Sequence, residues 1–257
     1  MGWTLFFLLL IGLICGPIIQ MVLYSTLGIE IGNFCWGQTL LYIMSFLPSL
    51  LYLLYLYKKE ALPKPHVGEI SFSIIPLSLL SLLSLSVVVS SLPVGDYPVW
   101  YLERLKTMVS DNNLFWSIMG VSVIAPVCEE LIFRRVILVD LLTRNKPAVA
   151  ILISSLLFGV VHLNWWQGVT ATIYGLFFGW LYFKTKKISI TILLHSVNNS
   201  ISILLAYLFA EDISKIARPL GEIVVEPSLF YPIIIVSIVI FAVSIYILNK
   251  INRTPFK

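Results

Sequence analysis

The chain has 257 residues, of which 59% are hydrophobic and only 12% are charged. A soluble domain carries roughly 25% charged residues, so the composition excludes an ordinary soluble protein and indicates a polytopic membrane protein. The formal net charge of +4 is small, and the three cysteines are scattered, which argues against a disulfide framework or a zinc knuckle.

Long apolar stretches follow one another along the chain. The first, residues 3–27, lacks a basic leader and is too long for the apolar core of a signal peptide, so we interpret it as a retained span. The other predicted spans are residues 39–57, 70–92, 114–143, 147–163, 166–183, 188–209 and 229–249. The predicted fold class is therefore all-α: a polytopic bundle of eight transmembrane helices, in a single integral membrane domain over residues 1–257.

The longest polar stretches between these spans are residues 93–113 and 210–228. In the first, apolar residues recur at helical spacing, which predicts a short helix on the membrane surface, although a packed loop fits as well. These residues are Val99, Leu102, Leu105 and Val109.

Most lysines and arginines fall on one side of the predicted bundle, for example Lys184, Lys186 and Lys187, whereas most acidic residues fall on the other. Short cytoplasmic loops of membrane proteins are enriched in Lys and Arg. We therefore expect a multi-pass protein with both termini in the cytoplasm.

The fourth span contains A-P-V-C-E-E-L-I-F-R-R-V, residues 125–136. A charged side chain at the bilayer centre costs on the order of 2.5–3.5 kcal/mol on insertion scales, so these charges need partners. Glu130 and Arg134 are four residues apart, share a helix face and are predicted to pair. Glu129 points about 100° away and must face another span or a water pocket. Pro126 predicts a kink or a restart of the helix.

Two other spans carry polar residues at helical spacing: Phe158 and His162 in the fifth, and His195 and Asn199 in the seventh. With Glu129 they supply a carboxylate, two imidazoles and a carboxamide. Hydrolysis of an amide needs a base for water and donors for the oxyanion. Glu129 is the candidate base, His195 and Asn199 are candidate oxyanion donors, and His162 would orient the water or protonate the leaving amine.

The two histidines differ in predicted depth. The span boundaries put His162 near the outer end of its helix and His195 nearer the cytoplasmic end of its own, a difference of ~10 Å at 1.5 Å per residue. The turn L-N-W-W-Q-G, residues 163–168, is expected to lie below the outer surface and to bring His162 deeper. G-L-F-F-G, with Gly175 and Gly179, predicts close helix packing inside the bundle.

The motifs E-E-x-x-x-R from Glu129, F-x-x-x-H from Phe158 and H-x-x-x-N from His195 stand in order in separate spans. This set resembles the CAAX protease and bacteriocin-processing family (CPBP, also called Abi) of intramembrane proteases, which includes the Ras-converting CAAX endopeptidases. The resemblance covers residues 110–210, the predicted catalytic core. It implies an eight-helix bundle with an intramembrane cavity open to the cytoplasm and lipid, and hydrolysis of membrane-associated substrates.

By this resemblance Glu129 activates water, and His162, His195 and Asn199 are the other catalytic groups. Glu130, Arg134 and Phe158 are implied as supporting residues, whereas Arg135 and Cys128 receive no role. The family has been called metalloproteases, and zinc bound by Glu129, His162 and His195 is an alternative with an open position for water. The H-E-x-x-H arrangement is absent, so we favour a mechanism without metal or other cofactor.

The function predicted is therefore that of an intramembrane endopeptidase, with prenylated CAAX-type substrates as one option. The alternative is a non-catalytic protein of the same fold that binds a membrane peptide or acts in bacteriocin immunity or regulation. Buried Glu and His also form relays in proton-coupled transporters, but here they cluster in three spans rather than in two related halves. The expected partners are the lipid bilayer and a membrane-associated peptide or protein, and not nucleic acid.

Overall fold

The computed structural model describes residues 2–27, 35–60, 74–92, 98–110, 114–215 and 226–251. Within these ranges the regular structure is helical, without a strand, so the predicted all-α class is confirmed. The helices before the motif-bearing region are α1 (Gly2–Leu27), α2 (Cys35–Lys58), α3 (Ile74–Ser90) and α4 (Val99–Met108). Those after it are α8 (Pro147–Val160), α9 (Trp165–Thr185), α10 (Ile188–Leu208), the 3-10 segment η4 (Ala210–Lys215) and α12 (Pro227–Ile251).

The fourth predicted span is one continuous helical run with two π-helical segments. In chain order it comprises α5 (Leu114–Ser117), the π-helical segment η2 (Ile118–Ile124), α6 (Ala125–Glu130), the π-helical segment η3 (Leu131–Leu138) and α7 (Val139–Leu142). π-Helical segments are rare and occur frequently at functional sites.

Each predicted span coincides with a helix in the described residues. In the part of the chain that the structure describes, three helices are long and apolar enough to cross a membrane: Leu114–Leu142, Ile188–Leu208 and Ser228–Ile251. Four other apolar segments are shorter: Gly2–Cys15, Ile43–Lys58, Ile74–Ser90 and Pro147–Val160. Transmembrane helices are thus supported, and the full set of eight spans stays a prediction.

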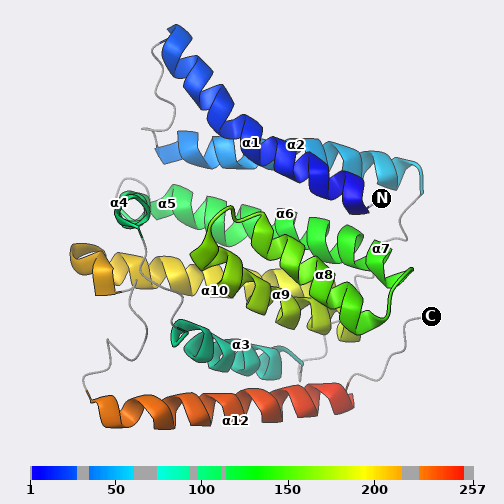
Figure 1. Cartoon of the computed structure of the whole chain (residues 1–257), viewed down its shortest axis with the longest axis vertical. Coiled ribbons are helices and arrows are strands. Elements are labelled where there is room, and N and C mark those ends of the chain that lie inside the picture. The colour runs from blue at the N-terminus through cyan, green and yellow to red at the C-terminus, as the bar shows by residue number, and fades with distance from the viewer. Residues whose placement is uncertain are drawn as a thin grey trace.

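The helices form layers with the motif-bearing helices in the middle (Figure 1). α1 packs against α2 on one side of the molecule, and α3 packs against α12 on the other. The helices between them are α5 to α7, α8, α9 and α10. This arrangement surrounds the polar residues of the motifs with helices on both sides.

The α8–α9 hairpin is a tight contact between two helices. A Cβ atom at Gly159 would collide with the Thr172 hydroxyl and the Gly168 carbonyl. Further along, a Cβ on Gly175 would lie 3.1 Å from the Ser155 Cβ, and Gly179 faces Ile151. The predicted role of Gly175 and Gly179 in close packing within the bundle is therefore confirmed.

The polar stretch 93–113 contains the predicted short helix, α4. Val109 is buried with Ile203 and Ala206, whereas Val99 at the other end of the predicted stripe is 74% exposed. The Tyr101 hydroxyl accepts a hydrogen bond from Gln167 Nε2 at 2.8 Å. α4 is therefore attached to the α8–α9 hairpin and to α10.

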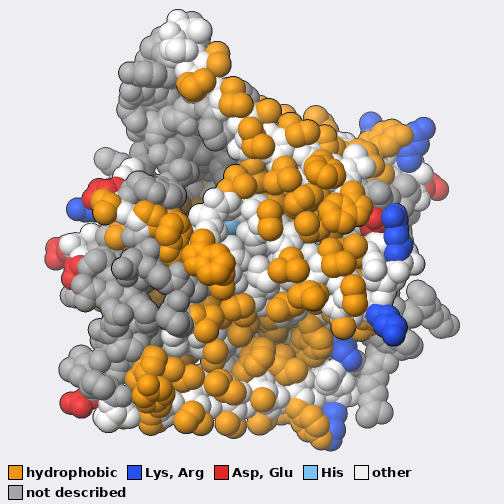
Figure 2. Space-filling model, viewed as in Figure 1, with side chains coloured by type: hydrophobic (Ala, Val, Ile, Leu, Met, Phe, Trp, Pro, Cys, Tyr) orange, Lys and Arg blue, Asp and Glu red, His pale blue; other side chains and the backbone are white. Residues whose placement is uncertain are grey.

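Charge is distributed unevenly over the face in Figure 2. Lysine and arginine side chains gather at one end of the molecule, and acidic side chains lie mainly at the other. α1 begins and α12 ends at the basic end. This agrees with the charge bias read from the sequence, and the orientation in the cell stays a prediction.

Candidate active site

Pro126 lies at the junction of the η2 and α6 segments. The residues on its N-terminal side, Ile124 and Ala125, keep right-handed helical dihedral angles, so the helix does not restart at the proline. What changes is the hydrogen-bond register: the Ala125 N–H bonds to the carbonyl of Gly120, five residues earlier. The π-helical turn accommodates the proline, which would otherwise crowd the carbonyl four residues before it.

Glu130 is the centre of a fully buried charge cluster. Its Oε2 lies 3.1 Å from Arg134 Nε, so the predicted ion pair is present, with 0% and 1% of the two side chains exposed. Its Oε1 accepts a hydrogen bond from His195 Nδ1 at 3.0 Å. One carboxylate therefore joins a cation of its own helix to an imidazole of α10.

The guanidinium of Arg134 is enclosed by aromatic rings. Its central carbon lies 4.5 Å from the ring centroid of Phe158 and 5.7 Å from that of Phe178. Its NH2 group is 3.5 Å from the carbonyl of Gly175. Ring faces attract a cation most strongly where water is excluded, so these contacts stabilise the buried charge. Phe178 was not predicted from the motifs.

Glu129 approaches the other nitrogen of the same imidazole. Its Oε2 lies 3.6 Å from His195 Nε2, and the two side chains are 9% and 7% exposed. A carboxylate only accepts hydrogen bonds, so the bond to Glu130 requires the proton on His195 Nδ1. Nε2 is then the nitrogen on the side of Glu129. The adjacent glutamates thus hold one histidine from opposite sides.

His162 is oriented by the end of its own helix. The Phe158 carbonyl lies in the last turn of α8 and is 2.8 Å from His162 Nδ1. A carbonyl accepts and does not donate, which puts the proton on Nδ1 and leaves Nε2 as the basic nitrogen of the neutral ring.

Phe158 also connects the two histidines. Its ring centroid lies 5.1 Å from that of His162 and 5.7 Å from that of His195, both edge-on. Despite the predicted difference in depth, both histidines therefore contact the same side chain, that of Phe158. The position named as supporting in the motif touches both imidazoles and Arg134.

Asn199 is attached to the π-helical segment η2. Its Nδ2 donates a hydrogen bond to the Val121 carbonyl at 2.8 Å. The structure thus joins Glu129, Glu130 and His195 directly, and links His162 through Phe158 and Asn199 through Val121. The bond to Val121 follows no sequence pattern, because any residue type presents a backbone carbonyl.

The alternative zinc set of Glu129, His162 and His195 would need these side chains to be arranged as metal ligands. Among the described residues, no group of three or more His, Cys, Asp and Glu side chains has such an arrangement. The His195 Nδ1 proton is held by Glu130, and Nε2 faces Glu129. We derive no step through a metal. Cys128 and Arg135 are both buried, 6% and 5% exposed.

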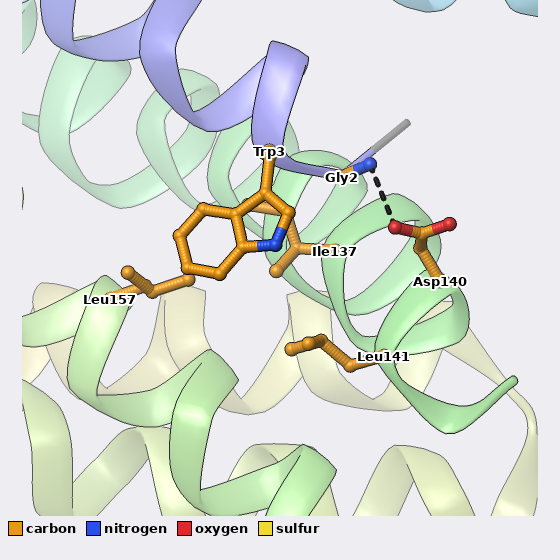
Figure 3. A pocket seen from close by; sticks show the side chains of 6 residues that line it. All are labelled: Gly2, Trp3, Ile137, Asp140, Leu141 and Leu157. Atoms are coloured by element: carbon orange, nitrogen blue, oxygen red, sulfur yellow. Dashed lines mark hydrogen bonds between the residues drawn. The ribbon is translucent and has the colours of Figure 1, made fainter. Parts of the chain in front are cut away.

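A small pocket lies away from these residues, between the start of α1 and the end of the motif-bearing helix (Figure 3). The backbone N–H of Gly2 donates to Asp140 Oδ2 at 3.1 Å, and Arg144 pairs with Asp140 Oδ1 at 3.2 Å. Trp3 and Leu157 line the same pocket. None of the motif residues lines this pocket, and the Gly2–Asp140 contact in it anchors α1. The pocket is therefore not the intramembrane cavity expected at the motifs, and that cavity stays a prediction.

The fold and the buried polar cluster define an α-helical membrane protein with acidic, imidazole and amide groups brought together. Residues 111–201 match the family described as type II CAAX prenyl endopeptidase Rce1-like. The resemblance to the CPBP family is confirmed over this segment, which lies within the predicted core of residues 110–210.

A curated protein of Bacillus subtilis (strain 168), named "Putative membrane peptidase YdiL", is 34% identical to this chain over 84 residues. The match covers 33% of this chain and 34% of the relative, so it spans about a third of either protein. No solved structure matches the chain. Over about a third of its length, the chain is thus similar to a CAAX prenyl endopeptidase family and to a protein named as a membrane peptidase.

Proposed function

We propose that the protein is an intramembrane endopeptidase in which Glu129 activates a water molecule for attack on a peptide carbonyl. The observation that carries the proposal is that Glu129 and Glu130 lie against opposite nitrogens of the buried His195 ring, Nε2 and Nδ1. A base for water beside a donor for the oxyanion is what hydrolysis of an amide requires. The match of residues 111–201 to an endopeptidase family supports the same reaction.

In the proposed reaction, Glu129 takes one proton from water while the water oxygen forms a bond to the carbonyl carbon. The oxyanion that develops accepts hydrogen bonds from the Asn199 carboxamide and from His195 Nε2–H, which requires the ring to carry a proton on both nitrogens. Glu130 keeps the other nitrogen, Nδ1, protonated and fixes the ring, so the imidazole presents Nε2 to the reaction.

The tetrahedral intermediate then breaks at its C–N bond. The leaving nitrogen takes the proton that Glu129 received from water and departs as an amine, while the carbonyl fragment leaves as a carboxylate. His162, whose Nε2 is an acceptor in the neutral ring, serves to orient the attacking water. Loss of one oxyanion donor typically lowers kcat by about 10²–10³-fold. Arg134 takes no part in proton transfer and serves to neutralise Glu130.

We further propose that all the predicted spans cross the membrane, with both termini cytoplasmic and a cavity leading to Glu129. The charge distribution and the coincidence of predicted spans with helices support this topology. The substrate is a membrane-associated peptide or protein, and a prenylated CAAX-type C-terminus is the first candidate, because the matched family is named for it. No metal or other cofactor takes part.

The test uses the full chain purified in detergent and a fluorogenic CAAX peptide, with and without a prenyl group. Wild type should cleave the prenylated peptide, and Glu129→Gln should lower kcat at least ~10²-fold with unchanged thermal unfolding. Glu103→Gln is the matched control, since Glu103 is an exposed glutamate on α4. Cleavage by Glu129→Gln at the wild-type rate would refute the role of Glu129.

A panel of other membrane-anchored peptides tests the identity of the substrate separately from the peptidase reaction. Cleavage of a non-prenylated peptide alone would overturn the prenyl assignment and retain the peptidase. If no peptide is cleaved, and Glu129→Gln complements a deletion strain as well as wild type, the peptidase proposal is wrong.

A further inference from the structure

In a π-helix each N–H bonds to the carbonyl five residues earlier, and the Val121 carbonyl does not receive its bond of this kind. The last bond of that kind joins the Ala125 N–H to the Gly120 carbonyl. The following bond would join residue 126 to Val121, but residue 126 is proline and has no N–H. The π-helical segment accordingly ends at Ile124. Pro126 therefore frees one carbonyl on the helix that carries Glu129.

Asn199 uses that carbonyl. Its Nδ2 lies 2.8 Å from the Val121 oxygen. Because the acceptor is a carbonyl, the nitrogen rather than the oxygen of the carboxamide must face it. This bond fixes the rotation of the Asn199 side chain and uses one of its two N–H groups. The second N–H remains for another acceptor.

We infer that Pro126 is a positioning residue that acts through Val121 to hold the Asn199 carboxamide in one orientation. The inference rests on the proposed function for its kinetic consequence, because Asn199 is there an oxyanion donor. A carboxamide already held by one N–H presents the other without further ordering, which is the advantage of preorganised donors. The contact itself is independent of the chemistry.

Pro126→Ala tests this by restoring a backbone donor. The new N–H can continue the π-helical series to Val121 and competes with Asn199 for the same oxygen. Misplacement of a catalytic group by about 1 Å can cost about 10²-fold, so we expect kcat to fall by ~10–100-fold with KM within about twofold. Pro232→Ala is the matched control, because Pro232 also lies inside a helix, α12, but is exposed.

A double-mutant cycle distinguishes positioning from general damage. In an Asn199→Ala background, Pro126→Ala should have almost no further effect on kcat, because the group that it displaces is absent. Independent, multiplying effects of the two substitutions would overturn the inference. Should Pro126→Ala not fold, Pro126→Ser supplies the same N–H and replaces it in the cycle.

A second measurement needs no activity. In protein labelled with 13C at valine carbonyls, with Val121 assigned through Val121→Ile, the Val121 resonance should move on Asn199→Ala. In the Pro126→Ala background, Asn199→Ala should leave that resonance unmoved. An unmoved resonance in the protein that retains Pro126 would refute the contact. A moved resonance in a protein without peptidase activity would retain the contact and reject the proposed function.

Discussion

Glu130 and His195, which are 65 residues apart in the chain, share a hydrogen bond of 3.0 Å in the buried centre of the bundle. This bond ties the motif on the fourth predicted span to the motif on the seventh. Because Glu130 also pairs with Arg134, a single carboxylate sets both the charge balance and the orientation of the imidazole.

The buried ion pair leads to the first prediction. Glu130→Ala leaves the Arg134 cation without its carboxylate, and removing one partner of a buried pair costs about 3–5 kcal/mol of unfolding free energy. Glu130→Leu combined with Arg134→Met should recover part of that stability while activity stays lost, because His195 remains without its acceptor. Thermal unfolding in detergent and the cleavage assay measure the two effects. Equal stability of the single and double variants would contradict the compensation.

Phe158 gives the second prediction. Its ring contacts Arg134, His162 and His195, so Phe158→Leu keeps an apolar side chain but removes a ring face from all three. We expect a loss of about 1–2 kcal/mol in stability and a lower kcat. Phe115→Leu is the control, since Phe115 is 63% exposed. Wild-type kcat in Phe158→Leu would show that the ring only fills space.

The third prediction concerns the anchor of α1. Asp140→Ala removes the acceptor of the Gly2 N–H and should lower the unfolding free energy by about 1–3 kcal/mol. Arg144→Ala should cost less, about 0–1 kcal/mol, because the Arg144 side chain is 61% exposed. Cleavage per folded molecule should be unchanged in both variants. A lower kcat in Asp140→Ala at matched folded concentration would contradict a purely structural role.

Metal dependence gives the fourth prediction. Both ring nitrogens of His195 face glutamates, so we expect the rate of cleavage to be unchanged by EDTA or 1,10-phenanthroline. The rate is measured in metal-depleted buffer, before and after addition of zinc. Inhibition by both chelators, reversed by zinc, would instead favour a metallopeptidase.

Spacing along the chain predicted the local part of the site. Glu130 and Arg134 pair because positions four apart on a helix are neighbours, and helical spacing likewise placed His195 and Asn199 one turn apart on α10. The longer contacts could not be predicted. Whether Glu129 or Glu130 accepts the hydrogen bond of His195 Nδ1 depends on how α10 packs against α6. The periodicity of the sequence contains no information about that packing.

The hydrogen-bond register of the fourth helix is the second feature beyond prediction. Composition and the motif indicated one apolar helix with a proline, and a kink or a restart was expected at Pro126. The structure has π-helical segments on both sides of α6 instead. Pro126 explains where η2 ends, but the rest of the register depends on backbone bonding over several turns, to which individual side chains contribute weakly.

A π-helical bond closes over one residue more than an α-helical bond, and this has a consequence for the length of the chain before Glu129. Removing a single residue from 118–124 would let that stretch wind as an ordinary α-helix with the same number of turns. The E-E pair would keep its place facing α10, and α5 would keep its own partners. A relative with an uninterrupted α-helix there should therefore differ from this chain by a one-residue gap just upstream of the proline.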